Sequence, residues 1–425
     1  MIDVKLLRED PKIFEANAKK KGCDVKLISE VLNLDKKWRD LKLRADNLRR
    51  SRNEISESIN KAKKEKDEKK AKILIEEAKE IPEKLKKLEE DEKKVHDFFR
   101  KKLAEIPNIM SDRVPLGKSE KENVVDKVYG KPTKKVFEVK SHVEIAEGLG
   151  IADFESSARV SGTGFYYLEG DLALLNQALI SYARNFMVEK GFRYIETPLM
   201  LKEDIIDQVT DLNDKQNQIY LMKDTDLALI GTSEHSLIGR FAGREITSSD
   251  LPIKHTSYSM CFRKEIGSHG LDEKGLFRTH QFNKMEMVVI CAPEESEKFF
   301  EEMKGITVDI FKGLRIPIRV LKICSGDLGD LKYEQVDIEA WSPRKKAYFE
   351  VGSCSNLTDA QARKLGISTI RGGQRITPHT LNNTAIATSR ALVAILENNQ
   401  LKDGSVKIPS VLQKYMGGKK VIKRG

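Results

Sequence analysis

The sequence predicts an α+β protein in which an N-terminal antiparallel helical hairpin precedes a domain that mixes strands with helices. Apolar residues recur alternately every three and four positions over residues 27–62 and again over 74–99, which is the spacing of a coiled coil. Between residues 261 and 286, two alternating apolar segments flank a polar middle that contains Gly267, Gly270 and Gly275. That pattern is typical of two antiparallel strands joined by a long loop.

Composition limits the classes of function open to the chain. The 425 residues allow two or three domains, and the 39% hydrophobic content supports a core. The net charge of +10 favours an anionic partner such as nucleic acid, although many basic proteins have none. The five cysteines form no CxxC or Cys/His cluster, so we expect neither a zinc site nor a disulfide framework, and a reducing cytoplasm fits best. We also expect no signal peptide and no membrane span.

The N-terminal arm, residues 1–106, is expected to begin with a small cap. This cap would be a strand or turn followed by a helix that starts near Asp10-Pro11. The heptads then predict two long helices, the first roughly 55 Å long at 1.5 Å per residue. Pro82 should kink or break the second helix, and Pro107 should end it.

One stretch of the arm is strongly basic. Residues 36–52 carry eight basic and two acidic side chains. A solvated coiled-coil face would explain a charged helix, but it would mix the two signs more evenly. The pattern therefore favours a phosphate-binding surface. Its candidate contacts are Arg44, Arg49, Arg50 and Arg52.

Residues 107–140 are interpreted as a linker, because prolines and glycines recur there among polar residues. The domain predicted to follow spans 141–425. Its Ser161-Gly162-Thr163-Gly164 segment could be mistaken for a phosphate loop, but it lacks the lysine and the following helix, so we interpret it as a turn.

The predicted hairpin at 261–286 carries charged side chains on one face. Arg263 and Glu265 share a side of the first strand, because alternate residues of a strand point the same way. Five residues share a face of the second strand: Arg278, His280, Phe282, Lys284 and Glu286. At this point two interpretations remain open. The face is either solvated, or it binds phosphate, ammonium or Mg²⁺.

The same stretch resembles a known family. FRKE at 262–265, followed by GLFRTHQFNKME at 275–286, is similar to the second signature motif of class II aminoacyl-tRNA synthetases in its seryl-tRNA synthetase form. The helical arm, the GLGIADFE segment at 148–155 and the C-terminal tail resemble that family too, so the likeness covers essentially the whole chain. It implies a class II antiparallel β-sheet flanked by helices. It also implies activation of L-serine with ATP and transfer to the 3′ end of tRNA(Ser), and it leaves tRNA(Sec) open as a second acceptor.

The resemblance implies a site for ATP and Mg²⁺. Arg263 would bind the α-phosphate and the serine carboxylate, and Arg390 would hold the γ-phosphate. Glu350 and Ser353 would place the metal ion. The implied ATP-binding residues are Arg263, Lys264, Glu265, Arg278, Thr279, Glu350, Val351, Gly352, Ser353 and Arg390.

A serine pocket is implied as well. Thr232 and Glu234 lie where a strand enters a helix, and a Thr-x-Glu there is usually only a helix cap. In the family the matching loop contacts serine, and a hydroxyl beside a carboxylate suits its ammonium and hydroxyl groups. The implied serine-binding residues are Thr232, Glu234, Arg263, Glu286, Asn382 and Thr384. Arg263, Glu286 and Arg390 are the expected catalytic residues.

The resemblance also bears on assembly. GFRYIETPLML at 191–201 is similar to the first class II motif, which implies a homodimer, and the arm would bind tRNA. Two alternatives differ from this in one feature each. A homologue that acts on a non-tRNA acceptor would lack the long arm, which is present. A catalytically dead RNA-binding homologue would have lost Arg263, Glu286 or Arg390, and all three are present.

Overall fold

The computed structural model describes residues 1–132, 134–210, 212–265 and 275–424. The chain divides into two compact units, Met1–Pro107 and Asn108–Gly425. No helix of the described residues is long and apolar enough to cross a membrane. The predicted loop glycines Gly267 and Gly270 lie outside the described residues.

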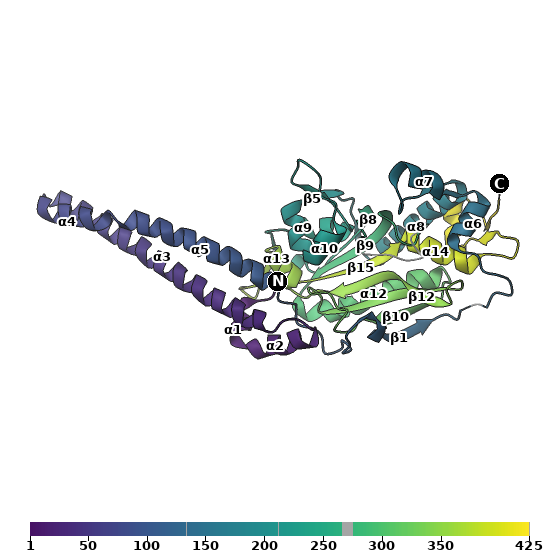
Figure 1. The fold of residues 1–425 in the computed structure, drawn as a ribbon, viewed down its shortest axis with the longest axis horizontal. Helices are drawn as coiled ribbons and strands as arrows, with labels where there is room; N and C mark the ends of the chain where they lie inside the picture. Colours follow the sequence, from purple (N-terminus) through teal and green to yellow (C-terminus); the bar gives the residue numbers. More distant parts are fainter. Residues whose placement is uncertain (133, 211, 266–274, 425) are drawn as a thin grey trace. The chain divides into compact units, whose positions relative to one another are not determined.

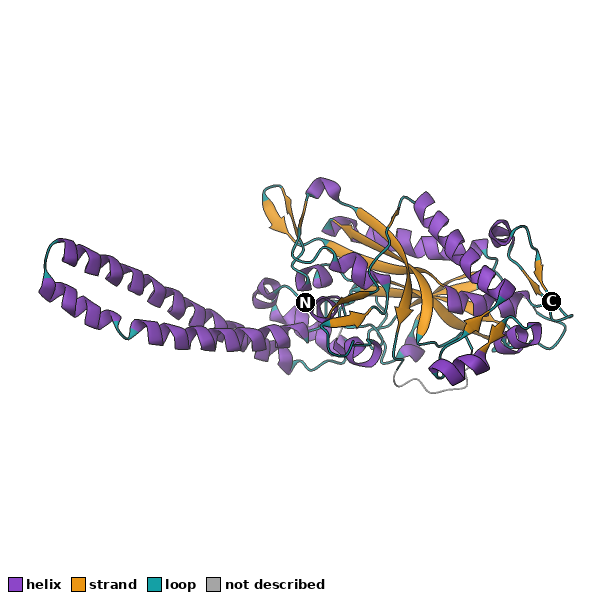
Figure 2. Ribbon diagram, turned by 90° about the horizontal axis from the view of Figure 1, so that it is seen from above, coloured by secondary structure: helices purple, strands orange, loops and turns teal. Residues whose placement is uncertain are grey.

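The first unit is a helical hairpin, as predicted (Figures 1 and 2). Its helices are α1 (Val4–Glu9), α2 (Pro11–Lys20), α3 (Lys26–Lys64), α4 (Glu68–Ala78) and α5 (Ile81–Ala104). The 39 residues of α3 correspond to about 58 Å at 1.5 Å per residue. The expected strand or turn at the N-terminus is instead the short helix α1, because Asp3 caps it by accepting a hydrogen bond from the Lys5 amide at 2.8 Å. Pro82 lies in the first turn of α5, and the helix is interrupted just before it, as expected.

Apolar contacts join the two sides of the hairpin. The heptad seam buries Val31 and Ala45 of α3 and Leu85 of α5. The Trp38 ring stacks on Phe99, with ring centroids 5.9 Å apart. Because these contacts lie within the hairpin, the first unit has an apolar seam of its own.

The second unit is built on an eight-stranded sheet. The strand order is β1-β10-β11-β12-β15-β9-β8-β4, and each neighbouring pair is antiparallel except the parallel β4–β8 pair. The bounds of its strands are β1 (Val124–Tyr129), β4 (Arg193–Tyr194), β8 (Ile253–Phe262), β9 (Gln281–Cys291), β10 (Ile318–Lys322), β11 (Glu334–Ser342), β12 (Ala347–Asn356) and β15 (His379–Ala387). The shorter strands are β2 (Ala152–Asp153), β3 (Tyr167–Leu168), β5 (Met200–Lys202), β6 (Leu227–Leu229), β7 (Glu245–Ile246), β13 (Ser368–Arg371), β14 (Gln374–Ile376), β16 (Val406–Lys407) and β17 (Val421–Ile422).

Helices pack around this sheet (Figure 2). They are α6 (His142–Leu149), α7 (Phe154–Ser161), α8 (Gly170–Glu189), α9 (Glu203–Val209), α10 (Leu212–Gln218), α11 (Ser233–Gly239), α12 (Ser296–Gly313), α13 (Ala360–Lys364), α14 (Thr388–Asn399) and α15 (Ser410–Gln413). The main core joins α8, α12 and α14 to alternate residues of β9, among them Met285 and Met287. The residues that alternate with them along β9, such as Lys284 and Glu286, therefore face the opposite side of the sheet.

The expected linker over residues 107–140 needs correction. Residues from Asn108 onward belong to the second unit, and β1 pairs with β10 at the edge of the sheet. The Asn108 side chain also donates hydrogen bonds to the carbonyls of Leu331 and Leu357, at 3.1 and 3.0 Å. Prolines and glycines indicated irregular backbone correctly, but irregular backbone can still pack on a domain.

Candidate active site

The predicted hairpin is present as β8 and β9, which pair from Ile253↔Ile290 to Phe262↔Gln281. Lys284 and Glu286 lie within β9, whereas Arg263, Glu265 and Arg278 lie just beyond the paired strands. The Arg263 amide still donates to the His280 carbonyl at 2.9 Å, but Glu265 has φ +49° and has left the strand conformation. Alternation alone therefore did not place these side chains correctly.

A cavity of about 380 Å³ lies on the polar side of β9, β12 and β15. It brings together most residues of the predicted site. These are Thr232, Glu234, Arg263, Glu265, Arg278, Thr279, Glu286, Glu350, Val351, Gly352, Ser353, Asn382, Thr384 and Arg390. Lys264 is not among the lining residues, and its amide donates to the Gln218 carbonyl at 2.9 Å.

His280 was expected on the same face as Phe282, but it does not line the cavity. Its Nδ1 lies 3.0 Å from the Arg263 carbonyl oxygen, and its ring packs against Phe165. A Cβ on Gly164 would lie 2.6 Å from the His280 ring, and Gly164 has φ +83°. The SGTG segment, predicted as a turn, thus needs glycine where His280 packs against it.

One end of the cavity is acidic and lined by hydroxyl groups. Buried Glu286 pairs with Lys284 at 2.5 Å and accepts a hydrogen bond from the Thr232 hydroxyl at 3.2 Å. Thr384 lies directly opposite Glu286 in the β9–β15 ladder. Such a set can hold a small ligand that carries both an ammonium and a hydroxyl group.

The protonation of this end is shifted by burial. Burial and the nearby charge of Glu286 raise the pKa of Glu234 to about 7. Gln361 donates a hydrogen bond to Glu234 at 2.9 Å and opposes the shift in part. Burial and two nearby cations lower the pKa of His235 to about 3, so this imidazole is neutral at physiological pH. Glu234 is therefore the group at this end expected to change charge near neutral pH.

The other end of the cavity carries arginines. Arg263 Nε donates to the Gly231 carbonyl at 3.1 Å, and its guanidinium carbon lies 5.4 Å from the centre of the Phe282 ring. Arg390 donates to the Glu350 carbonyl at 3.0 Å and lies 3.1 Å from the carboxylate of the same residue. Guanidinium groups held in this way suit phosphate oxygens.

Two neighbouring carboxyl groups of the cavity, Glu350 and Asp337, have pKa values that are shifted in opposite directions. Glu350 lines the cavity and is 45% exposed, yet cavity walls surround it. Burial alone would raise the pKa of Glu350, but the nearby cations, with Arg390 the strongest, together hold this pKa below its usual value. Burial and then the charge of Glu350 raise the pKa of Asp337 to about 7.

Glu350 and Ser353 fit a Mg²⁺ ion whose other ligands are water and the phosphate oxygens of a bound nucleotide. The Ser353 hydroxyl is buried without a well-formed hydrogen bond among the described residues, although it is close enough to Asp337 to lower that carboxyl's pKa. The described residues contain no cluster of three or more His, Cys, Asp or Glu side chains able to hold a metal. Mg²⁺ commonly takes one or two protein oxygens and fills its other positions with water and phosphate, so two oxygen-bearing side chains such as Glu350 and Ser353 would be enough to hold it.

Several lining residues were not predicted as site residues. Phe282 lay on the predicted face but was given no role. Gln335 and Asp337 alternate along β11, so the strand pattern could have placed them beside Glu350. Phe277 and Lys332 also line the cavity and carry no local sequence signal for it.

Comparisons with known proteins extend over both units. A seryl-tRNA synthetase N-terminal domain family matches residues 1–110, and the tRNA synthetase class II core domain family (G, H, P, S and T) matches residues 219–399. The chain is 44% identical to a serine–tRNA ligase from Methanocella arvoryzae, over 98% of this chain and 99% of that protein.

Two crystal structures are similar throughout. One is a seryl-tRNA synthetase from Pyrococcus horikoshii complexed with ATP, with a TM-score of 0.92 and 39% identity, covering 100% of both chains. The other is a cytoplasmic serine–tRNA ligase from Naegleria fowleri in complex with AMP, with a TM-score of 0.88 and 34% identity. It covers 100% of this chain and 99% of that one.

Proposed function

This chain belongs to the seryl-tRNA synthetase family, and we propose that its cavity activates L-serine with ATP and that the enzyme then transfers serine to tRNA(Ser). The observation that supports this most directly is that one cavity has an acidic, hydroxyl-lined end around Glu286 and Thr232 and an arginine-lined end around Arg263 and Arg390. A non-tRNA acceptor is disfavoured, because residues 1–110 match the seryl-tRNA synthetase N-terminal domain. A catalytically dead homologue is disfavoured because the expected catalytic side chains all line the cavity.

The proposed first step joins serine to AMP. The serine carboxylate attacks the α-phosphorus of ATP, a P–O bond forms, and pyrophosphate leaves with the electrons of the broken P–O bond. Arg263 would stabilise the charge on the α-phosphate, while Glu286 and Thr232 would hold the amino acid. No general base is needed, because the attacking carboxylate is already ionised.

Arg390 would bind the γ-phosphate, for which it must exchange its contact with the Glu350 carboxylate. Mg²⁺, held by Glu350 and Ser353, would neutralise phosphate charge. In the second step the terminal ribose hydroxyl of tRNA attacks the seryl carbonyl carbon, the acyl–phosphate bond breaks, and AMP leaves.

Amino-acid-dependent exchange of pyrophosphate into ATP tests the proposed function. A panel of amino acids should show exchange with serine far above that with any other. Exchange that favours another amino acid would contradict the proposal.

Serine use should depend on pH through Glu234. With its pKa raised to about 7, this carboxyl is largely neutral below pH 7 and becomes an anion above it. The anion attracts the serine ammonium, so kcat/KM for serine should rise about tenfold per pH unit below 7 and level off above it. Glu234→Gln should remove this step. The pKa of Asp337, near the proposed ATP and Mg²⁺ site, is also raised to about 7, so its titration would change ATP binding over the same pH range. Saturating ATP and Mg²⁺ remove this second source of pH dependence from the profile for serine. A profile unchanged by Glu234→Gln would contradict the assignment.

We propose a cytoplasmic homodimer. The GFRYIETPLML segment supports the dimer by its resemblance, and α8 exposes apolar side chains, with Leu174 56% and Val188 52% exposed. Sedimentation at micromolar concentration tests this assembly, and a fully active monomer would contradict it.

The arm is proposed to bind tRNA, and its four candidate arginines differ in surroundings. Arg44 is exposed beside Asp40 at 2.9 Å. Arg50 and Arg52 are also exposed. Arg49 instead donates to Glu89 of α5 at 2.9 Å and joins the two sides of the hairpin. Arg44, Arg50 and Arg52 are therefore the better candidates for binding phosphate, and Arg49 contributes to the hairpin itself.

Deleting residues 1–105 should leave adenylate formation intact but sharply reduce transfer to tRNA, because the basic surface that binds the tRNA phosphates is removed. Replacing Arg44, Arg50 and Arg52 with glutamate should have the same effect more mildly. The slope of log K for tRNA binding against log salt should flatten by about 0.7 to 0.9 for each arginine that no longer binds a phosphate. Measuring both half-reactions on one preparation separates the outcomes. Equal loss of both would mean that folding depends on the arm, and unchanged transfer would mean that the arm does not bind tRNA.

A further inference from the structure

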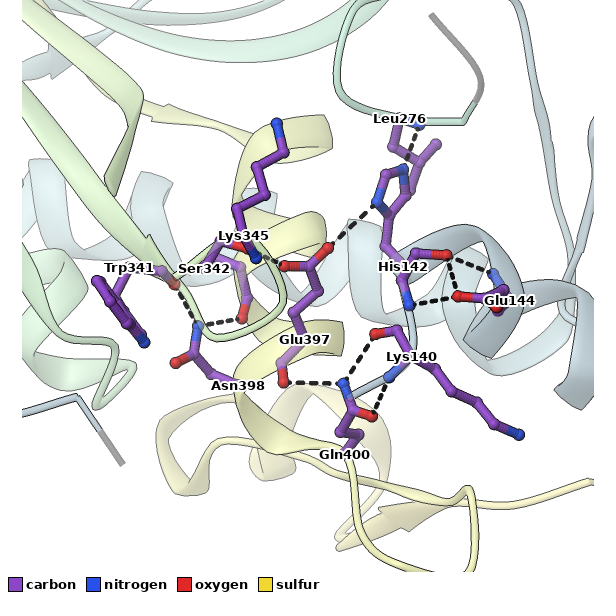
Figure 3. A network of polar contacts seen from close by, with 12 residues as sticks. Lys140, His142, Glu144, Leu276, Trp341, Ser342, Lys345, Glu397, Asn398 and Gln400 are labelled. Atoms are coloured by element: carbon purple, nitrogen blue, oxygen red, sulfur yellow. Dashed lines mark hydrogen bonds and ion pairs between the residues drawn. The ribbon is translucent and has the colours of Figure 1, made fainter. Parts of the chain in front are cut away.

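We propose that the buried carboxylate of Glu397 positions Leu276 and Phe277 for ATP binding, acting through His142 and Ser342 (Figure 3). None of the three residues Glu397, His142 and Ser342 lines the cavity, so they would be positioning residues. The inference rests on the proposed function, because it assigns the arginine-lined end of the same cavity to ATP.

The first branch runs through His142. This side chain is 5% exposed, and its Nε2 accepts a hydrogen bond from the Leu276 amide at 3.1 Å. Because Nε2 accepts, a neutral His142 carries its proton on Nδ1, which lies 3.6 Å from a Glu397 carboxylate oxygen (Figure 3). The carboxylate thus favours the tautomer that can accept the Leu276 N–H.

The second branch runs through Ser342. Its hydroxyl donates to the other Glu397 oxygen at 2.5 Å and accepts from the Lys345 amide at 3.1 Å. The Lys345 ammonium nitrogen lies 4.1 Å from the centre of the Phe277 ring. The two branches of one carboxylate therefore end on consecutive residues, Leu276 and Phe277.

Phe277 links these branches to the cavity, which it lines. Its ring packs on Phe349, with centroids 5.4 Å apart, and the guanidinium carbon of Arg390 lies 5.8 Å from its centre. Arg278, the next residue, also lines the cavity. A shift of the Leu276 backbone would move the aromatic surface on which Arg390 rests.

The helix that carries Glu397 also carries Arg390, two turns earlier. The C-terminal end of this helix, α14, is fixed on two sides. Gln400 exchanges two hydrogen bonds with the backbone of Lys140, at 2.9 and 3.0 Å, and Asn398 donates to the Trp341 carbonyl at 2.7 Å (Figure 3). Because both residues lie on this one helix, Arg390 and Glu397 stay at a constant distance from each other.

The close approach of His142 also explains a glycine of the hairpin motif. A Cβ on Gly275 would lie 2.4 Å from His142 Nε2, and Gly275 has φ +94°. Both facts restrict this position to glycine as long as His142 occupies its place. Glu397 is 1% exposed, and a buried carboxylate is costly unless it is hydrogen-bonded, as this one is to the Ser342 hydroxyl.

The test compares two substitutions at His142. Gln can still present an acceptor to the Leu276 amide, whereas Leu has similar bulk and no acceptor. Ser342→Ala interrupts only the second branch. His255→Leu is the matched control, because His255 is buried and stacks on Phe241, and neither residue lines the cavity.

Two quantities are measured for each variant. Pyrophosphate exchange, normalised to active sites, gives KM for ATP and KM for serine, and a melting experiment gives the thermal shift produced by ATP alone.

His142→Leu should raise KM for ATP about tenfold, the scale of removing one buried hydrogen bond, and leave KM for serine within about twofold. His142→Gln should restore KM for ATP to within about threefold of the native value, Ser342→Ala should raise it in part, and His255→Leu should not change it. Equal rises in both KM values, or equal effects of Leu and Gln at position 142, would overturn the inference. If the native protein shows no serine-dependent exchange, the proposed function fails, but the ATP thermal shifts of the variants still decide the inference.

Discussion

Replacing Arg263 with alanine is expected to slow seryl-adenylate formation by about two to three powers of ten. Removing one preorganised donor from a transition-state site typically costs about 3 kcal/mol. Arg263 is preorganised here, because its Nε is held by the Gly231 carbonyl at 3.1 Å and its guanidinium faces the Phe282 ring. Serine-dependent pyrophosphate exchange, normalised to active sites, measures the effect.

Arg263→Lys is the matched variant. It keeps the positive charge but loses the planar fork that can hold two phosphate oxygens at once, so an intermediate rate is expected. The Gly231 carbonyl loses its partner in both variants, and comparing them therefore separates this structural cost from the loss of charge. Exchange within tenfold of the native rate in the alanine variant would remove Arg263 from the proposed mechanism.

The features predicted correctly from sequence are those that local patterns determine. Heptad spacing predicted α3 and its partner helices, because an apolar seam must be buried along its whole length. Alternation up to Glu286 predicted a strand where β9 begins, and it placed Lys284 and Glu286 on one face, which is the face opposite the main core. Most site residues required the resemblance as well, since a lone glutamate in a strand, such as Glu350, is usually only exposed.

The features that sequence did not predict depend on contacts between distant segments. His280 leaves the predicted face because Gly164, more than a hundred residues earlier, provides space for its ring. The predicted linker becomes part of the sheet because β10 offers β1 an edge to pair with. No local pattern would bring Glu397 to His142, because those residues meet only after α14 has packed against the start of α6.

The native enzyme is expected to prefer serine over alanine by about four powers of ten in kcat/KM for activation. A site built to bond a substrate hydroxyl rejects an analogue that lacks it on this scale, because its buried polar groups are left unpaired. In this cavity those groups include Glu286, 2% exposed, and Thr232, 5% exposed. Pyrophosphate exchange with alanine and serine on one preparation measures the ratio.

Glu286→Gln is the variant that tests which group provides this preference. Alanine at this position would leave the Lys284 ammonium buried without its partner at 2.5 Å, and the resulting instability would obscure the effect on serine. Glutamine keeps an oxygen for the Thr232 hydroxyl but removes the negative charge that the serine ammonium requires. Serine activation should therefore fall by at least about a hundredfold, the scale of removing a charge-assisted hydrogen bond, while the thermal shift produced by ATP alone is retained.

Two outcomes would contradict these expectations. If the native enzyme activates alanine about as well as serine, the serine assignment is refuted. A Gln variant with near-native serine activation would leave recognition of the ammonium to Glu234 alone.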